Sequence, residues 1–558
     1  MVRESVELRA TSTRMTGAAA LVEMLHRYGV DTLFALPGVQ NDPLFNALYD
    51  ARGALRVVHT RHEQGAAYMA YGYARVTARP GAYAVVPGPG VLNTTAALAT
   101  AYAANARVLC ISGQIAADQI GRGWGMLHEI PDQLAILRGL TKWAARVDAA
   151  SQVPGLVGEA FTQLYTGRAR PVALEIPTDV LAQDAEIALT GGAGSYAALA
   201  PDPQAIERAA ALLRRAESPL IMVGGGAEDA AAELLAVAEL LQAPVVSSTH
   251  GRGIVSDRHY LGLHGPAGHR LWADADVVLA VGTRLLRPLT AWGVDDKLKI
   301  IRVDIDPEEI ERILPPTIGI VADARLALAA LHDVLAAHNK PRASREAELR
   351  ALKAEFDQGF AEIRPQYDFI RALREALPDD GFFIDEMTQM AYAARYALPV
   401  YQPRTYITPG YQGTLGYGFA TALGVKIAYP NRAVLSISGD GGFMFNVAEL
   451  ATAVLHGIGV VAVVFNDGAY GNVLRMQKET YGGRIIATRL WNPDFVALAE
   501  SFGVVGARAA TPTELGEAVR AGFERSSPTL IEVPVGEMAD PRRFTHLPRV
   551  RPRGRQAQ

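Results

Sequence analysis

Short apolar runs rich in Val, Ile and Leu alternate with longer helical patterns along almost the whole chain. Runs such as AVLSIS and VVAVVF are short, β-branched and almost wholly apolar, which is typical of strands buried on both faces of a sheet. Strands that alternate with helices form parallel sheets, because each parallel connection needs a crossover. The pattern therefore predicts an α/β fold of doubly wound parallel sheets, and not a β-sandwich or a helix bundle.

Two linkers divide the pattern into three units. The stretch GGAGSYAALAPDP is rich in Ala, Gly and Pro, and RASREAELRALKAEFDQ is a charged helical connector. A length of 558 residues also suggests three domains, at about 100–200 residues per domain. We predict domains at residues 15–185, 203–335 and 365–535, followed by a basic tail at residues 536–558.

Composition excludes several classes of function. The net charge of −4 gives no footprint of nucleic-acid binding. No apolar stretch approaches the ~20 residues of a membrane span. Cys110 is the only cysteine and reads as a small core residue in VLCIS. The N-terminal segment MVRESVELRATSTR lacks the apolar core of a secretion signal and reads as a polar arm. A cytoplasmic location is the simplest expectation.

The segment AVLSISGDGGFMFNVAELATAVLHGIGVVAVVFNDGAYGNV carries the most chemistry. Residues 433–438 and 460–465 read as buried strands, and residues 447–456 have helical spacing between them. Parallel strands place their carboxyl ends on one edge of the sheet, where α/β proteins bind ligands. Asp440 and Asp467 are therefore expected to converge.

Oxygen ligands near a glycine-rich turn suit a magnesium diphosphate. The three glycines allow a tight turn and bring N–H groups to an anion: Gly439, Gly441 and Gly442. Mg²⁺ would take oxygen from Asp440, Asp467, a backbone carbonyl near Ala469, and phosphate. The alternative is two ordinary turns at strand ends.

A GDG motif followed at this distance by an Asn pair resembles the thiamine-diphosphate signature. The chain is similar to the superfamily of acetolactate synthases, pyruvate decarboxylases and benzoylformate decarboxylases over nearly its whole length. The resemblance implies pyrimidine-binding, middle and diphosphate-binding domains, with thiamine diphosphate and Mg²⁺ as cofactors. One departure is that Asp467 replaces the second Asn of the pair. It still supplies an oxygen, and its charge should favour the metal. Tyr470 is a candidate for contact with cofactor or substrate.

The segment VVHTRHEQGAAYMAYGYAR is predicted to pass from a strand into a helix at about Glu63. The resemblance implies that Glu63 hydrogen-bonds the aminopyrimidine ring and promotes the tautomer that removes the C2 proton. Burial at a subunit interface would favour the protonated carboxyl and suit proton sharing. Read alone, Glu63 is a favourable charge in the first turn of a helix.

The segment YQGTLGYGFATALG is a third motif that resembles the thiamine-diphosphate enzymes. This resemblance implies that the Gly413 carbonyl accepts from the pyrimidine amino group and that Leu415 forces the cofactor into a bent form. Bending brings the reacting atoms together. In this family the two halves of the site come from different subunits, so a homodimer or homotetramer is expected, with active sites at the interface.

Several positions expected to face the substrate differ from the well-known relatives. Val39, beside Gln40, takes the place of a polar catalytic residue of the simple decarboxylases. His128 in GMLHEIPDQ stands where acetolactate synthases carry Gln, and Met476 in GNVLRMQ stands where they carry a Trp that selects the acceptor. Gln114 and Tyr470 are lining or packing residues.

The middle domain resembles a flavin- or nucleotide-binding domain. The VGGG run at residues 223–226 is a weak phosphate-loop signal, and Arg284 and Arg287 are either anion ligands or solvated charges. FAD and ADP both remain open. The basic tail is expected to be a surface strap, or to fold over the mouth of the active site.

The leading hypothesis is a carbon–carbon lyase or ligase acting on a 2-oxo acid, which makes the chain a transferase or lyase. Acetolactate-synthase-like decarboxylation and carboligation fits TRHEQGAA, SGQ and NPDFVALAESFG. The alternatives are a simple 2-oxo acid decarboxylase and a 2-hydroxyacyl-CoA lyase. A noncatalytic cofactor-binding regulatory subunit is a further alternative, against which Glu63 argues.

Overall fold

The computed structural model describes residues 12–552. Most of the predicted N-terminal arm (residues 1–11) and the end of the basic tail (residues 553–558) lie outside this range. The described end of the arm is not irregular: β1 (Ser12–Thr16) pairs antiparallel with β8 (Asp184–Ala188). The chain forms two compact units: unit 1 holds the residues up to 196 with 420–428 and 446–456, and unit 2 holds the rest.

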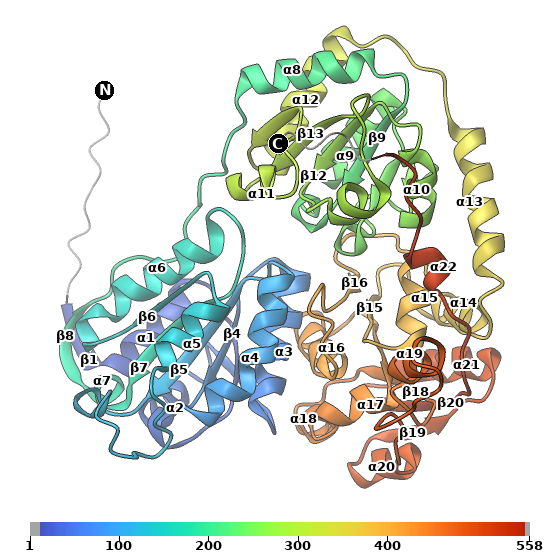
Figure 1. Ribbon diagram of the computed structural model, residues 1–558. Helices are drawn as coiled ribbons and strands as arrows, with labels where there is room; N and C mark the ends of the chain where they lie inside the picture. The colour runs from blue at the N-terminus through green and yellow to red at the C-terminus, as the bar shows by residue number, and fades with distance from the viewer. Residues whose placement is uncertain (1–11, 553–558) are drawn as a thin grey trace, which may run out of the picture. The chain divides into compact units, whose positions relative to one another are not determined.

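Three six-stranded sheets, each wholly parallel, confirm the predicted doubly wound α/β fold (Figure 1). The N-terminal and C-terminal sheets have the same strand order, β3-β2-β4-β5-β7-β6 and β16-β15-β17-β18-β20-β19. The central sheet has the order β11-β10-β9-β12-β13-β14. In each sheet the order of the chain reverses between two central strands, and ligands of open α/β sheets bind at such points.

The N-terminal sheet lies in unit 1. Its strands are β2 (Thr32–Ala35), β3 (Arg56–His59), β4 (Gly81–Val85), β5 (Val108–Gln114), β6 (Trp143–Arg146) and β7 (Val172–Pro177). Its helices are α1 (Gly17–Arg27), α2 (Asp42–Asp50), α3 (Glu63–Thr77), α4 (Pro89–Ala103), α5 (Gln133–Leu140), α6 (Val153–Tyr165) and α7 (Thr178–Ala182). Helices α3, α4 and α5 pack in series, and α1 packs against α2 and α6. Cys110 is buried and free, as expected of a core residue.

The central sheet lies in unit 2. Its strands are β9 (Pro219–Val223), β10 (Val245–Ser247), β11 (Gly262–Leu263), β12 (Val277–Val281), β13 (Lys299–Asp304) and β14 (Ile318–Val321). The helices along this part of the chain are α8 (Pro203–Arg215), α9 (Ala231–Leu241), α10 (Gly265–Trp272), α11 (Pro307–Glu311), α12 (Ala324–His338) and the connector α13 (Glu346–Phe360).

The C-terminal sheet, also in unit 2, has the strands β15 (Phe382–Ile384), β16 (Tyr406–Ile407), β17 (Val434–Gly439), β18 (Val461–Asn466), β19 (Val505–Arg508) and β20 (Thr529–Pro534). The helices along this part of the chain are α14 (Gln366–Ala376), α15 (Gln389–Ala397), α16 (Tyr417–Ala428), α17 (Asp440–Phe443), α18 (Glu449–Leu455), α19 (Gly471–Thr480), α20 (Phe495–Ser501), α21 (Pro512–Phe523) and α22 (Arg542–Thr545).

Candidate functional site

The order of the C-terminal sheet reverses between β15 and β17. Strand β17 also pairs with β18, and Gly439 lies opposite Phe465 in the register. The ends of the two strands are therefore level, so that Asp440 begins α17 just after β17 and Asp467 directly follows β18. The structure brings the two acids to one edge of the sheet.

The two carboxyl groups are close enough to influence one another. Burial raises the pKa of the Asp467 carboxyl to about 6, and the charge of Asp440 adds to the increase. Burial also raises the pKa of Asp440, although hydrogen bonds from Asn492 and from backbone N–H groups oppose the increase. Two partly buried acids side by side are costly unless a cation neutralises them.

The donor set fits a hard cation that also binds phosphate. Within residues 12–552, no group of three or more His, Cys, Asp or Glu side chains is placed to hold a metal ion. A cation between Asp440 and Asp467 would therefore complete its shell with backbone, water or phosphate oxygens, as Mg²⁺ commonly does. Asp467 Oδ1 already accepts from the N–H of Ala469 (3.1 Å), which keeps this turn folded against the acid.

Asn492 is a residue of this site that the sequence analysis used only as a family marker, in NPDFVALAESFG. Its Nδ2 donates to Asp440 Oδ2 (2.6 Å) and to Asn466 Oδ1 (2.9 Å). It thereby ties the ends of β17 and β18 together. Tyr470 packs against the same turn, since a Cβ at Gly441 would lie 2.7 Å from a Tyr470 ring carbon.

Mg²⁺ binding should depend on pH through Asp467. A proton must leave this carboxyl before the metal binds, so the Mg²⁺ affinity of the cofactor-saturated protein should fall about tenfold per pH unit below about pH 6. Calorimetric titrations at several pH values would measure this slope. The Asp467→Asn variant should show a shallower slope, and equal slopes would contradict the assignment.

The same pKa shift has the opposite effect on the metal-free protein. The folded-state pKa of about 6 lies above the ordinary value of 3.8. The stability contribution of Asp467 is therefore fully present below about pH 4 and is lost as the pH rises through about 6. Mg²⁺ should reverse this trend.

The predicted Gly413–Leu415 loop lies after β16. Gly413 has a φ of +58°, which favours glycine, and it packs near Met387. The N–H of Gly416 donates to Glu386 Oε1 (2.7 Å). Burial raises the pKa of Glu386 to about 7, although the donors Gly416 and Ser438 favour its charged form.

Gln389, at the start of α15, was also missed by the sequence analysis. It is buried, and its side-chain amide makes no hydrogen bond to the described residues. A Cβ at Gly471 would lie 2.4 Å from Asp467 Oδ2 and 3.7 Å from Gln389 Cγ, so the amide is close to the acidic pair. An unsatisfied buried amide beside a predicted diphosphate site is suited to an oxygen ligand.

Glu63 begins α3 in unit 1, at the helix start that the sequence predicts. Its Oε2 accepts from Asn93 Nδ2 on α4 (2.9 Å). Buried Glu449 accepts from the N–H groups of Arg61 (3.2 Å) and His62 (3.0 Å). The chain segment leading into Glu63 is thus held by a second acid of the same unit.

His128 and Gln40 form a pair in unit 1. Gln40 Nε2 donates to the Leu127 carbonyl (2.9 Å), so its Oε1 is the acceptor for His128 Nδ1–H (2.9 Å). This pairing assigns the Nδ1–H tautomer and leaves Nε2 with a lone pair. Val39, in contrast, is 62% exposed.

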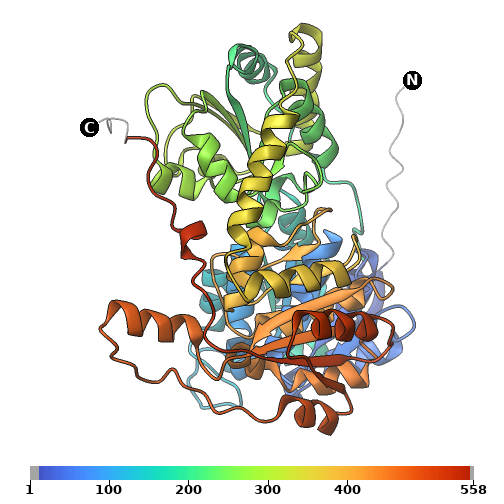
Figure 2. The ribbon, with the colours of Figure 1, turned by 90° about the vertical axis from the view of Figure 1, so that its right-hand side faces the viewer.

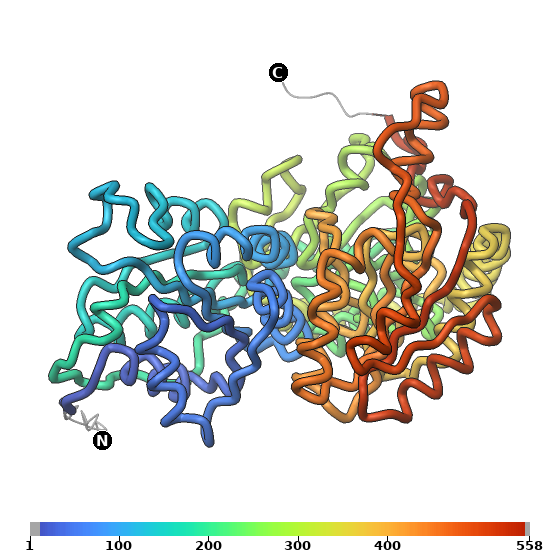
Figure 3. Tube along the Cα trace, turned by 90° about the horizontal axis from the view of Figure 1, so that it is seen from below, coloured from blue at the N-terminus to red at the C-terminus, as the bar shows by residue number. Residues whose placement is uncertain are grey.

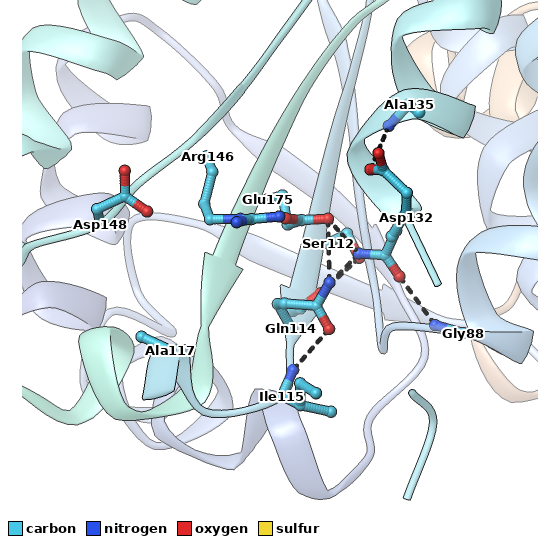
Figure 4. Close-up of polar contacts among 12 residues, drawn as sticks. Gly88, Ser112, Gln114, Ile115, Ala117, Asp132, Ala135, Arg146, Asp148 and Glu175 are labelled. Carbon is cyan, nitrogen blue, oxygen red and sulfur yellow. Dashed lines mark hydrogen bonds and ion pairs between the residues drawn. The ribbon is translucent and has the colours of Figure 1, made fainter. Parts of the chain in front are cut away.

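Gln114 belongs to a buried polar network (Figure 4). Its Nε2 donates to Glu175 Oε2 (3.2 Å), and its Oε1 accepts from the N–H of Ile115 (2.8 Å). Glu175 is fully buried and pairs with Arg146 (2.6 Å). Gln133 donates to the same carboxylate and accepts from the N–H of Gly88 (2.9 Å). Both ends of the Gln114 amide are therefore engaged within the protein, which favours the packing role.

Met476 is 37% exposed on α19. Helix α19 and the loop after it extend away from the C-terminal sheet (Figures 2 and 3). Met476 Sδ lies 3.6 Å from Arg542 Nη1, and Arg542 also pairs with Glu479 and Asp540.

The tail then continues beside the helices and loops around the central sheet (Figure 2), where Arg551 donates to the carbonyls of Trp272 and Ala275. Buried Arg551 pairs with Asp295 (2.8 Å). The described tail is therefore a strap in which Arg542, Arg543 and Arg551 are paired.

The two arginines predicted in the middle domain are also engaged. Arg284 stacks over the ring of Tyr411 (4.7 Å), and Arg287 donates to the Thr545 carbonyl. The VGGG run follows β9, and Arg284 follows β12, the two strands between which the central order reverses.

Comparison with known proteins assigns the family. Three family models of the thiamine pyrophosphate enzymes match: the N-terminal TPP binding domain at residues 15–136, the central domain at 206–331 and the C-terminal TPP binding domain at 386–533. The chain belongs to the thiamine pyrophosphate enzymes. It is accordingly a thiamine-diphosphate-dependent enzyme of the decarboxylase and carboligase type, which confirms the family and the main cofactor expected from the sequence.

The relatives include a decarboxylase and acetolactate synthases by name. A probable 2-ketoarginine decarboxylase of Pseudomonas aeruginosa is 36% identical over 93% of this chain and 94% of its own length. A probable acetolactate synthase large subunit of Methanocaldococcus jannaschii is 34% identical over 97% and 94%. The acetolactate synthase large subunit of Corynebacterium glutamicum is 34% identical over 95% and 88%. Among residues 12–552, no helix has the length and apolar character to cross a membrane.

Proposed function

We propose that the enzyme uses thiamine diphosphate and Mg²⁺ to decarboxylate a 2-oxo acid, and then joins the remaining acyl unit to an acceptor carbonyl. The observation that carries the proposal is the pair Asp440 and Asp467 at the ends of adjacent strands: burial raises the pKa of both carboxyl groups, the charge of Asp440 adds to the increase at Asp467, and a divalent cation would offset both effects. The bound cofactor supplies the carbon nucleophile and the electron sink that decarboxylation needs.

The chain's own groups have separate tasks in this proposal. Asp440 and Asp467 hold the cation, with Ala469 as the backbone ligand, and residues 439–442 meet the diphosphate. Gly413 and Leu415 would contact the pyrimidine ring and position it for reaction. Glu63 shares its proton with the pyrimidine ring. Tyr470 packs at the diphosphate turn.

Simple decarboxylation, in which the acyl unit is protonated to an aldehyde, is the second candidate. The His128–Gln40 pair favours it, because an imidazole held by its Nδ1–H can take up a proton at Nε2 and pass it on. Exposed Met476 also favours simple decarboxylation, because a flexible side chain holds an acceptor molecule less firmly than a rigid one.

Product analysis separates the candidates. Cofactor-loaded protein would be given pyruvate or 2-ketoarginine, each with and without an aldehyde acceptor, and the products read by mass spectrometry. A 2-hydroxy ketone supports carboligation, and aldehyde alone supports simple decarboxylation. Turnover of 2-hydroxyacyl-CoA would instead support the lyase alternative. If the protein binds the cofactor but turns over none of these substrates, the proposal is refuted.

We further propose that unit 1 of one subunit and unit 2 of its partner complete each site in a homodimer or homotetramer. Mixing Glu63→Gln subunits with Asp440→Ala subunits tests this. After random reassociation, roughly a quarter of the sites would carry both intact halves, so activity should rise to about that fraction of wild type. Activity that stays at the level of the separate variants would contradict a shared site.

The reversal point of the central sheet is our proposed location for FAD or ADP, next to residues 223–226. Visible absorbance of the purified protein would reveal a flavin, and chromatography after denaturation would reveal ADP. This part of the proposal would be contradicted if the purified protein contained neither FAD nor ADP and still retained neither after incubation with each of them.

A further inference from the structure

Residues 386–389, here called the β15 connector, touch each of the cofactor-binding segments predicted in unit 2. Glu386 contacts the loop at residues 413–416 and the end of β17, and Met387 lies next to Gly413. A Cβ at Gly439 would lie 3.6 Å from Thr388, and one at Gly471 would lie 3.7 Å from Gln389. The connector therefore links the Leu415 loop, the GDG turn and the Asp467 turn.

Glu386 makes the polar contacts between two of these segments. Its Oε1 accepts from the N–H of Gly416 (2.7 Å), and its Oε2 accepts from the Ser438 hydroxyl (2.8 Å). Gly416 lies one residue after Leu415, and Ser438 lies two residues before Asp440. A single carboxyl group thus joins the predicted bending residue to the predicted metal turn.

The glycines around Glu386 leave the space that its carboxyl group occupies. A Cβ at Gly442 would lie 1.8 Å from Oε1, and a Cβ at Gly418 would lie 2.9 Å from Oε2. Neither position has room for a larger residue while the carboxyl group stays in place. The second and third glycines of the motif GDGG are therefore not equivalent: Gly441 makes room for Tyr470, and Gly442 makes room for Glu386.

We propose that Glu386 is a positioning residue that sets Leu415 relative to the diphosphate turn. The inference rests on the proposed function, because it assigns the positioning of the pyrimidine ring to Leu415. A fully buried carboxyl group is costly, and an apolar side chain would fill the same space more cheaply. What the carboxyl group adds is directed hydrogen bonds from Gly416 and Ser438, with a further backbone N–H donor at Gly418.

The neighbouring acid provides a matched control. Asp385 is also fully buried, but it accepts from the hydroxyls of Tyr406 and Tyr417 (both 3.0 Å) and pairs with Arg395 (3.4 Å). None of these bonds reaches residues 413–416 or 438–442. Asp385 reaches the Leu415 loop only indirectly, through Tyr417 and Arg395, so Asp385→Asn should change stability much more than it moves that loop.

Hydrogen exchange and kinetics of the holoenzyme test the inference. Glu386→Ala should remove the exchange protection of the Gly416 amide and lower kcat about 100-fold, because small misplacements cost that much. The Kd for thiamine diphosphate should change much less. Glu386→Gln should recover most of kcat, since its oxygen can accept from Gly416 and its amide can donate to Ser438. Asp385→Asn should leave Gly416 exchange and kcat near wild type while lowering the Tm.

Wild-type Gly416 exchange and kcat in a folded Glu386→Ala protein would overturn the inference. Should that variant not fold, Ser438→Ala removes one bond only, and it should raise exchange at residues 438–442 and lower kcat about tenfold. Unchanged values there would overturn the inference as well. Exchange is measured without turnover. If the enzyme turns over none of the tested 2-oxo acids, the proposed function is refuted. The role of Glu386 in positioning Leu415 is then still tested by the hydrogen-exchange measurement.

Discussion

Replacing Glu63 by Gln is expected to lower kcat about 1,000-fold while the protein still binds thiamine diphosphate. General acid–base groups contribute typically 10²–10⁴-fold, and an amide of the same shape cannot share a proton with the pyrimidine ring. Helix α3 should persist, because His62 caps it and Glu449 holds the preceding backbone independently of the Glu63 side chain. Steady-state kinetics give the loss in kcat, and deuterium exchange at C2 of the bound cofactor shows whether the loss lies in proton removal.

Glu23→Gln is the matched control for this variant. Glu23 lies in the same unit, on α1, and makes an exposed pair with Arg27. Exposed pairs contribute little, so kcat should stay within about twofold of wild type. Full activity and full C2 exchange in Glu63→Gln would refute the assignment of Glu63.

Replacing Asp440 by Ala is expected to raise the Mg²⁺ concentration for half-maximal activity by about 100-fold or more. Loss of a residue that merely supports a metal ligand costs about 10–100-fold, and loss of a ligand should cost at least as much. The change also frees Asn492, which holds the ends of β17 and β18 together. Magnesium titrations at saturating cofactor, followed by activity and by calorimetry, measure the effect.

Asp467→Asn should behave differently, because it creates the Asn pair that the resemblance to the thiamine-diphosphate signature implies. The amide oxygen still binds the cation, but one negative charge is lost, so Mg²⁺ affinity should fall only about tenfold and kcat at saturating Mg²⁺ should be nearly unchanged. Asp333→Asn, at an exposed position of the same unit, serves as the surface control. Equal losses in the Asp440 and Asp467 variants would contradict the unequal roles assigned here.

The interior strands of the three sheets were predictable from the sequence, and most of the edge strands were not. Strands such as β5 and β17 are buried along nearly their whole length and therefore read as apolar runs. The strands with a weaker sequence signal lie at sheet edges: β6, β11, β14, β16 and β19. They are short or partly exposed, as WAAR and VGAR illustrate, because an edge strand has a neighbour on one side only.

The convergence of Asp440 and Asp467 was likewise predictable, because parallel topology alone brings successive strand ends together. The contributions of Asn492, Gln389 and Glu386 were not. Each acts through a hydrogen bond, or a missing one, between segments distant in sequence, and no periodic pattern marks such a residue. The exposure of Val39 and the engagement of Gln114 also depend on packing that a linear motif does not encode.

The separation of the sites between the units has a practical consequence for redesign. Val39, Gln40 and His128 follow strands of the N-terminal sheet, whereas Asp440, Asp467 and Glu386 follow strands of the C-terminal sheet. A combinatorial library that randomises the first three positions, which are our proposed substrate-facing residues, leaves the described hydrogen bonds of Asp440, Asp467 and Glu386 in place. Variants that fail in a selection for new 2-oxo acids can be tested for cofactor binding. A variant that still binds the cofactor has a changed substrate preference, whereas a variant that does not has lost its cofactor site.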